Sequence, residues 1–360
     1  MVKRNYGIDL LRLLLMLMVV MLHTLGNGGV LRAVELHSAN YFLAWTIECL
    51  CYCAVNCYAL ITGYVSYGRP YRINSVIMIW LQAILYTLVI TALAWMFGDW
   101  HFSISYFLNA FLLPSSNPLW YVPVYTGVYV FIPVINTAVK SLSWKQTKYF
   151  LAVSFCALTV VPTFFLVDPF AQSGGYSVLW IGYLYFVGSV IKKYELDKRI
   201  SARHAGWVYL ISALILIASK FGPSLVTTLI WGEPRFDDIL LNYTSPVMPI
   251  IAAAMLVIFI NLRLTPKICK IIKVLSPAAF GVYLIHCQPY LFMKCHNLYA
   301  FLADYSVLKM VFGSVGISLL IFAFCLAVDL CRIALFKKLK IRDFVCMMEE
   351  KYLSCLKCFD

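Results

Sequence analysis

The chain has few charged residues. Only 16 of its 360 residues are acidic and 29 are basic, so that charged residues make up 12% of the sequence. A soluble domain carries roughly a quarter, because charges cover the surface that faces water. Apolar residues account for 62%, and the mean hydropathy is +0.84. These values exclude a soluble enzyme, a nucleic-acid-binding protein and a disordered chain, and they predict an all-α, polytopic membrane protein.

Apolar runs of the length that a membrane-spanning helix needs, about 17 to 25 residues, recur along the chain without the strict alternation of a membrane β-barrel. We expect about ten transmembrane helices in one domain over residues 1–336, followed by a cytoplasmic tail over 337–360. Two less apolar stretches, 101–118 and 222–242, could be surface or re-entrant segments. The expected spans lie near 7–26, 41–66, 74–97, 118–138, 147–167, 175–191, 205–221, 244–262, 275–293 and 307–335.

Lysine and arginine are concentrated in alternate segments between these spans. If the N-terminus is cytoplasmic, most of them fall in the inner loops over 69–72, 140–148, 192–203 and 263–273, and in the tail from Arg332 onward. This one-sided distribution follows the positive-inside rule. It predicts that both termini are cytoplasmic and that the chain lies in a plasma or bacterial inner membrane. The pattern gives no indication of the oligomeric state.

Cysteine is frequent, but its spacing indicates neither a disulfide nor a metal site. Cys49, Cys51 and Cys53 alternate, which on a helix directs them to different faces. Cys355 and Cys358 form a CxxC pair, but no second pair or flanking histidines complete a zinc set. We therefore expect small buried side chains and reduced cytosolic thiols, with no metal.

The first span contains three ionisable residues, Asp9, Arg12 and His23. Such residues are costly within a membrane, so each is a candidate for a functional site. At 100° per residue, the spacing from Arg12 to His23 is about 20° past three full turns, so both lie on one helix face about 16 Å apart. Asp9 is one turn before Arg12 and can pair with it. The spacing suggests a path across the bilayer; the alternative is a snorkelling arginine and a histidine hydrogen-bonded between helices.

The second span carries Glu48 about 10 Å from its outer end, within one turn of the depth expected for His23. A carboxylate there could hold the imidazole in one tautomer and stabilise its protonated form. Alternatively, Glu48 lies in the outer interface or pairs with Arg32. Arg69 and Arg72 close the inner end of this span. Arginines in such a loop commonly only set the topology, but here they could also face phosphate groups.

The ninth span begins with Ser276 and Pro277, which suit a helix N-cap followed by proline at the first helical position. It carries Tyr283 and His286, three residues apart on one side of the helix. We expect His286 near the midplane, where it could bond to another helix, line the path or take part in catalysis. Asn56 is a further polar residue, within the second span.

Five blocks occur in order along the chain: Asn5–Arg12 with His23, Ala54–Tyr64, Asn117–Tyr121, Tyr185–Gly188 and Phe280–His286. Together they resemble the acyltransferase-3 family of integral membrane proteins, which is marked by an arginine, ten residues and a histidine on its first helix. Arg12 and His23 match that pattern. Tyr58 and Thr62 stand where the family usually has Phe and Ser, and Pro118 replaces a common His.

The resemblance implies transfer of an acyl group, most often acetyl, from cytosolic acyl-CoA to a hydroxyl of an envelope glycan or a lipid-linked sugar. Acyl-CoA, in most cases acetyl-CoA, would be a co-substrate, without a permanently bound cofactor. Its phosphates would lie on Arg12 with Arg69 or Arg72. His23 would act as general base, oriented by Glu48. Direct attack on the thioester and a covalent acyl-histidine both remain open.

A carrier or flippase, for an amino acid such as serine or for polysaccharide export, is the alternative function, because relatives have been linked to these roles. Such a protein would show two pseudo-symmetric halves with broken helices at the midplane, which the sequence does not indicate. Under either hypothesis the partners include the lipid bilayer and no nucleic acid. The residues expected to line the substrate path are Asp9, Asn56, Tyr58, Trp120, Tyr283 and His286.

Overall fold

The computed structural model describes residues 4–98 and 117–356 of the chain. Within these residues every regular element is a helix and none is a strand, which confirms the predicted all-α class. Eight helical segments are long and apolar enough to cross a membrane: Tyr6–Ala33, Ala39–Ser66, Asn74–Phe97, Tyr121–Ser141, Trp144–Phe165, Ala202–Trp231, Pro266–His286 and Val307–Lys338. The protein is therefore a multi-pass membrane protein, and the predicted count of ten spans and the cytoplasmic termini stay predictions.

Two further predicted spans form shorter helices, and short helices connect the longer ones. The spans expected near 175–191 and 244–262 correspond to α10 (Val178–Lys193) and α13 (Val247–Ile260). The short elements are α2 (Val30–Ala33), η1 (Asn117–Leu119), η3 (Ser173–Gly175), α11 (Leu196–Arg199), α16 (Pro289–Lys294) and η5 (Ala300–Asp304).

Several long segments are interrupted helices. The break between α3 and α4 falls at Tyr52 and Cys53, and the break between α14 and α15 is a 3-10 turn at Ser276–Ala278. The pieces are α3 (Ala39–Cys51) with α4 (Ala54–Ser66), α8 (Trp144–Phe155) with the π-turn η2 (Cys156–Val160) and α9 (Val161–Phe165), and α14 (Pro266–Leu275) with η4 (Ser276–Ala278) and α15 (Ala279–His286).

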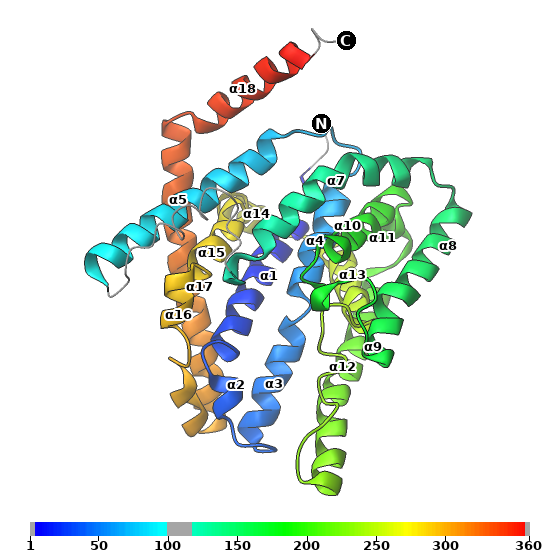
Figure 1. Cartoon of the computed structure of the whole chain (residues 1–360), viewed down its shortest axis with the longest axis vertical. Coiled ribbons are helices and arrows are strands. Elements are labelled where there is room, and N and C mark those ends of the chain that lie inside the picture. The colour runs from blue at the N-terminus through cyan, green and yellow to red at the C-terminus, as the bar shows by residue number, and fades with distance from the viewer. Residues whose placement is uncertain (1–3, 99–116, 357–360) are drawn as a thin grey trace.

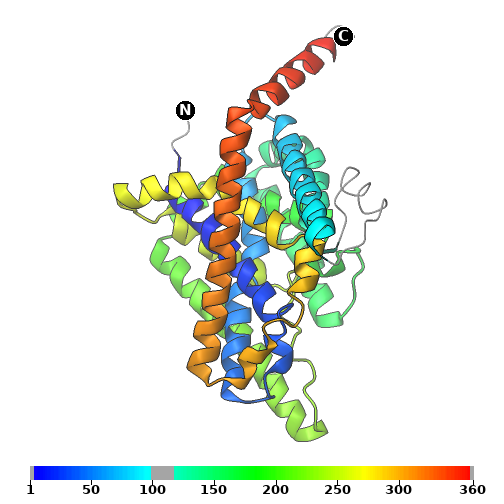
Figure 2. The same ribbon diagram turned by 90° about the vertical axis from the view of Figure 1, so that its left-hand side faces the viewer.

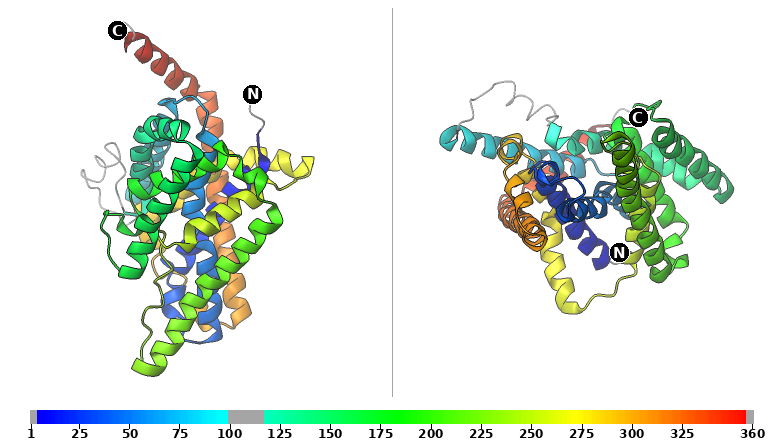
Figure 3. Two further views of the ribbon diagram at one scale, coloured as in Figure 1. Left: turned by 90° about the vertical axis from the view of Figure 1, so that its right-hand side faces the viewer. Right: turned by 90° about the horizontal axis from the view of Figure 1, so that it is seen from below.

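Helix α1 (Tyr6–Leu25) lies in the centre of the bundle, as Figures 1 and 2 show. It packs against α17 (Val307–Lys338) and α15 on one side, and against α3, α4 and α13 on the other. The view from below in Figure 3 shows α1 enclosed between α17 and α12 (Ala202–Trp231). Helix α1 begins and α17 ends at the same end of the molecule. Since α1 runs along the bundle, its polar residues lie at successive heights along the axis of the bundle.

The first turn of α1 is fixed by Asn5 and Gly7. The Asn5 side chain accepts from Ile8 N at 3.1 Å, which caps the helix, and donates to Ile260 O at 3.0 Å, which ties it to the end of α13. A Cβ at Gly7 would lie 1.8 Å from Phe259 O, so only glycine permits this approach of the two backbones. These contacts set the height and the rotation of α1, and hence of its polar face.

Two predicted boundaries differ from the structure. The span expected over 205–221 continues to Trp231, because Gly222 and Pro223 lie inside α12 and do not end it. The ninth span begins at Pro266, so Ser276 is not its N-cap but a bend within it. The expected C-terminal tail forms a helix, α18 (Ile341–Leu356), which packs beside the start of α5 (Asn74–Phe97). Most of the uncertain stretch 101–118 lies outside the described residues.

The tail helix is held to α5 by a side-chain cap. Glu349 Oε1 accepts from the backbone nitrogens of Ile73, at 2.6 Å, and Asn74, at 3.4 Å. A carboxylate at this position satisfies free N–H groups at the start of α5 and interacts favourably with its dipole.

Candidate active site

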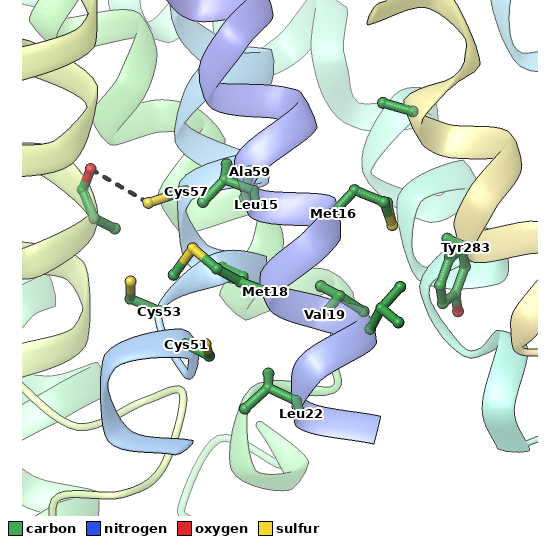
Figure 4. Close-up of a cluster of buried hydrophobic side chains, with 14 of the residues drawn as sticks. Leu15, Met16, Met18, Val19, Leu22, Cys51, Cys53, Cys57, Ala59 and Tyr283 are labelled. Carbon is green, nitrogen blue, oxygen red and sulfur yellow. Dashed lines mark hydrogen bonds between the residues drawn. The ribbon is translucent and has the colours of Figure 1, made fainter. Parts of the chain in front are cut away.

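Two cavities lie along α1, one at each end of its polar face. The outer cavity has a volume of about 340 Å³ and is lined by His23 and Glu48. The inner cavity has a volume of about 490 Å³ and is lined by Asp9 and Arg12. Met16 and Val19, on the face between the two ends, line the outer cavity. Figure 4 shows both pointing toward Tyr283 of α15. The predicted placement of Arg12 and His23 on one face of the helix is therefore confirmed.

The His23 ring is hydrogen-bonded to a second histidine. His23 Nδ1 lies 2.9 Å from His286 Nε2, and His286 Nδ1 lies 2.6 Å from the carbonyl oxygen of Val282. Because a carbonyl only accepts, His286 Nδ1 carries a proton. In a neutral pair His286 Nε2 then accepts from His23 Nδ1, which leaves Nε2 of His23 with a free lone pair. The contacts thus place a proton acceptor on a ring that lines the outer cavity.

Cys287 lies beside the two imidazoles. Its Sγ atom is 3.5 Å from His23 Nδ1 and 3.4 Å from His286 Nε2. The three potential ligand atoms lie within 4.8 Å of one another, a spacing that a transition metal could bridge. The contacts among the three side chains account for this spacing without an ion, and we assign no metal.

Glu48 is buried and lines the outer cavity together with His23. Its Oε2 atom has no hydrogen-bond partner among the described residues. The alternative pairing with Arg32 is wrong, because Arg32 donates to Asn297 Oδ1 at 2.7 Å instead. The polar contacts that the structure gives the His23 ring are with His286 and Cys287, so the partner position expected for Glu48 is taken by His286. Glu48 remains as a carboxylate on the cavity wall.

Most of the outer cavity wall is aromatic. Tyr283 and Trp120 both line it, as predicted. Tyr283 donates to Pro118 O at 3.0 Å and accepts from Tyr121 N at 3.1 Å, so it fixes the turn that leads into α7 (Tyr121–Ser141). The sequence analysis placed none of the other aromatic lining residues on the substrate path, although Tyr121 and Phe280 belong to two of the matching blocks; these residues are Tyr52, Tyr121, Tyr176, Tyr243, Phe280 and Phe292.

Asn56 does not line the cavity, contrary to prediction. It is fully buried behind the wall, where it donates to Tyr243 O at 2.8 Å and accepts from Trp180 Nε1 at 3.2 Å. Its amide is therefore used to hold the backbone of Tyr243 in place. A buried amide with partners at both ends is a structural device, and a polar residue within a span gives no sign of which side of the wall it is on.

The inner cavity combines four basic side chains with one carboxylate. Asp9 Oδ1 accepts from Arg12 Nη1 at 2.9 Å and Asp9 Oδ2 accepts from Arg4 Nε at 2.5 Å, which confirms the predicted Asp9–Arg12 pair. The side chain of Arg12 keeps an exposed fraction of 31%, so its guanidinium is accessible from the cavity. Arg69 and Lys192 add two further positive charges to the lining. The charge balance favours an anionic ligand.

Arg72 does not line this cavity, although Arg69 does. The backbone carbonyl of Arg72 accepts a hydrogen bond from Tyr129, and its side chain is exposed. Lys192 was counted only as a topology signal, yet its ammonium group contacts Tyr64, 3.4 Å from the hydroxyl. The adjacent pair of lysines at the end of α10 was the available indication, but the pair alone could not show which of them faces inward.

The two cavities share no lining residue among the described ones. On α1 they are separated by the single turn from Arg12 to Met16, about 6 Å along the axis. Tyr58, which lines the outer cavity, donates to the carbonyl oxygen of Arg12 at 2.5 Å. We call Arg12, Met16 and Tyr58 the neck. The predicted open path is thus two chambers on one helix face with a closed neck between them.

A buried ion pair lies elsewhere on α17. Arg332 donates to both oxygens of Asp329, at 2.9 and 2.7 Å, and Tyr86 donates to Asp329 Oδ1 at 2.6 Å. A Cβ at Gly281 would lie 2.0 Å from the Asp329 side chain, which shows how closely α15 approaches. The sequence analysis placed Arg332 at the start of the tail, but the structure buries it. The network joins α5, α15 and α17 and neither cavity includes it.

Comparison with known proteins gave a match over nearly the whole chain. The family model described as an acyltransferase domain matches residues 5–331. Neither the curated proteins nor the solved structures gave a match. The matched region contains the neck, the imidazole pair, the outer cavity lining and all of the inner cavity lining except Arg4.

Proposed function

This chain belongs to the acyltransferase 3 family of membrane proteins, and we propose that it moves an acyl group from cytosolic acyl-CoA to a hydroxyl of an envelope glycan or a lipid-linked sugar. The reaction would take place in the plasma or inner membrane. The observation that carries this proposal is the His23 ring, which lines the outer cavity with its Nδ1 atom bonded to His286.

The inner cavity suits the phosphate groups of the donor. Guanidinium groups bind phosphate through paired, charge-assisted hydrogen bonds, and the lining provides Arg12 and Arg69 together with Lys192. Asp9 holds Arg12 in place from the side, because the carboxylate binds one Nη atom and leaves the rest of the guanidinium accessible. Acyl-CoA would anchor here with its pantetheine arm directed along α1. Arg72, which lies outside the lining, is not part of this donor site.

The arm must pass the neck for the thioester to reach the outer cavity. The neck is only about one helical turn long, and Tyr58 and Met16 line the outer cavity at this point. Side chains change rotamer far more readily than backbone moves. Rotation of Tyr58 away from the Arg12 carbonyl would join the two chambers while α1 and α4 stay in place.

His23 would act as general base. The acceptor hydroxyl gives its proton to His23 Nε2 while its oxygen attacks the thioester carbon; the C–O bond forms, the C–S bond breaks, and CoA leaves as a thiolate. The proton on His23 then passes to that sulfur. His286 holds the ring at the angle that keeps Nε2 free and accepts from the Nδ1 proton throughout. An acyl-histidine step is the covalent variant of the same chemistry.

The outer cavity has the features of a site for a hydroxylated acceptor. Flat aromatic side chains give a sugar ring apolar faces to pack on, and a few polar groups fix its orientation. Glu48 supplies such a group, since its Oε2 atom has no partner among the described residues and can accept from a hydroxyl. A buried carboxylate oxygen without a partner is costly, so a ligand hydroxyl would remove that cost.

Transfer of labelled acetyl from acetyl-CoA to an envelope fraction tests the proposal. Membranes with the wild-type chain should form a covalent, ester-linked product, and membranes with His23→Ala should not. His204→Ala is the matched control, because His204 is an exposed histidine at the start of α12 and lines neither cavity. Label that enters vesicles without becoming ester-linked would favour the carrier alternative, and transfer that survives His23→Ala would eliminate the proposed base.

A further inference from the structure

A third cavity, which we call the side cavity, lies on the other side of the imidazole pair. It has a volume of about 170 Å³ and lies between α1, α15, α16 and α17. His23, Asn27 and Phe292 line both this cavity and the outer cavity, so the two meet at the catalytic ring. His286 lines only the side cavity of the two.

Apart from His23 Nε2, the polar groups on the wall of the side cavity are bonded within the protein. Thr24 donates to Val20 O at 3.0 Å and accepts from Ser318 at 2.9 Å, and both ring nitrogens of His286 are engaged. Asn27 donates to Phe292 O at 2.8 Å. The Tyr299 hydroxyl, also on the wall, is paired with Cys295 Sγ at 3.6 Å. The rest of the lining is aliphatic, aromatic or thiol: Val20, Ile285, Leu291, Phe292, Cys295, Ile321, Phe324 and Cys325. A hydroxylated or charged ligand would find few partners, whereas a hydrocarbon chain fits.

We propose that the side cavity holds the hydrocarbon part of the donor's acyl group, and that the enzyme prefers acyl groups of about four to six carbons to acetyl. This inference rests on the proposed function. The volume of the side cavity is close to that of a dry cavity of about 150 Å³ that binds benzene, a six-carbon ligand. Such a preference concerns the group transferred; the reaction itself is unchanged.

The geometry of the reaction selects this occupant. The acceptor hydroxyl must bond to His23 Nε2 and lie next to the thioester carbon, so the first acyl carbons lie against the His23 ring. That ring is a wall of the side cavity. A lipid anchor on the acceptor, in contrast, is separated from the reacting hydroxyl by the sugar. Each buried methylene adds about fourfold to kcat/KM at the usual transfer free energy.

A series of acyl-CoA donors tests this preference. With acetyl-, butyryl-, hexanoyl- and decanoyl-CoA, the kcat/KM of the wild type should rise to the four- or six-carbon donor and then fall. Ile321→Trp, which fills the cavity, should lower the hexanoyl-to-acetyl ratio of kcat/KM at least tenfold. Ile321→Ala, which enlarges it, should move the optimum to longer chains. Leu320→Trp is the control, because Leu320 adjoins Ile321 on α17 but is 72% exposed and does not line the cavity.

Two results would overturn the proposal while leaving acyl transfer intact. One is His23-dependent transfer whose kcat/KM falls steadily from acetyl to decanoyl. The other is a chain-length profile that Ile321→Trp and Leu320→Trp change equally. If Ile321→Trp does not fold, the wild-type profile and Ile321→Ala still decide. Absence of transfer from every acyl-CoA would instead refute the proposed function, and this inference with it.

Discussion

The inner and outer cavities are built from opposite kinds of residues along one helix. Around Arg12 the lining is charged and accessible, whereas around His23 it is aromatic and its ionisable groups are partly or fully buried. Charged groups bind a phosphate-bearing ligand where water still reaches them, while proton transfer benefits from surroundings that fix the reacting groups and exclude water. Under the proposed function, α1 would thereby separate anchoring of the donor from the chemistry.

Removal of the base should have the largest effect. We expect His23→Ala to lower kcat by about 10³-fold, within the range for loss of a general base, and to leave the KM for acyl-CoA nearly unchanged because the inner cavity is intact. Steady-state kinetics of labelled transfer in membranes measures both. A large rise in the KM for acyl-CoA would break the separation of the two cavities, since it would mean that His23 also binds the donor.

Loss of the anchoring guanidinium should act on the other constant. We expect Arg12→Gln to raise the KM for acyl-CoA by about 10- to 100-fold, as for loss of a charge-assisted contact, with a smaller effect on kcat. Lys145→Gln, an exposed residue near the start of α8 that lines neither cavity, is the control and should leave both constants unchanged. A fall in kcat with constant KM would place Arg12 in the chemistry instead.

His286 should act as a positioning residue. We expect His286→Ala to lower kcat by about tenfold or more, because His23 then loses the acceptor that fixes its tautomer. His286→Gln should recover part of this loss, since its side-chain oxygen can accept the same bond. A purely structural role would instead give equal losses for both variants, in proportion to the amount of folded protein.

The smallest effect is expected at the neck. Tyr58→Phe removes the hydrogen bond to the Arg12 carbonyl and should destabilise the protein by about 1 kcal/mol, measured as a modest fall in Tm. If opening of the neck limits turnover, the same change should raise kcat by a fewfold. If another step limits turnover, kcat should stay constant. A strong loss of kcat without loss of stability would show that the Tyr58 hydroxyl takes part in the reaction.

The sequence predicted the features that depend on the local geometry of one helix. The shared face of Arg12 and His23 and the Asp9 pair follow from 3.6 residues per turn, and both are found. The position of a residue along its helix, however, predicts its depth in the membrane and not which side chain of another helix it faces. Glu48 lies on the expected wall, yet the partner of His23 is His286, 263 residues away, and only the packing of α15 against α1 brings them together.

The positions at which helices are interrupted could also not be predicted from the sequence. The break at Tyr52 and Cys53 contains neither proline nor glycine, but it places Tyr52 on the wall of the outer cavity. Conversely, the span expected near 205–221 continues through Gly222 and Pro223 as helix α12.

Transfer across sealed, oriented vesicles tests the separation of the two cavities most directly. Labelled acyl-CoA is supplied only on the side of Arg12, and a membrane-impermeant glycan acceptor only on the side of His23. The account predicts ester-linked label on the acceptor with the wild type and none with His23→Ala. With Arg12→Gln the amount of label should be low at limiting acyl-CoA and should recover when acyl-CoA is in excess. Label that appears only when donor and acceptor share one side of the membrane would contradict it.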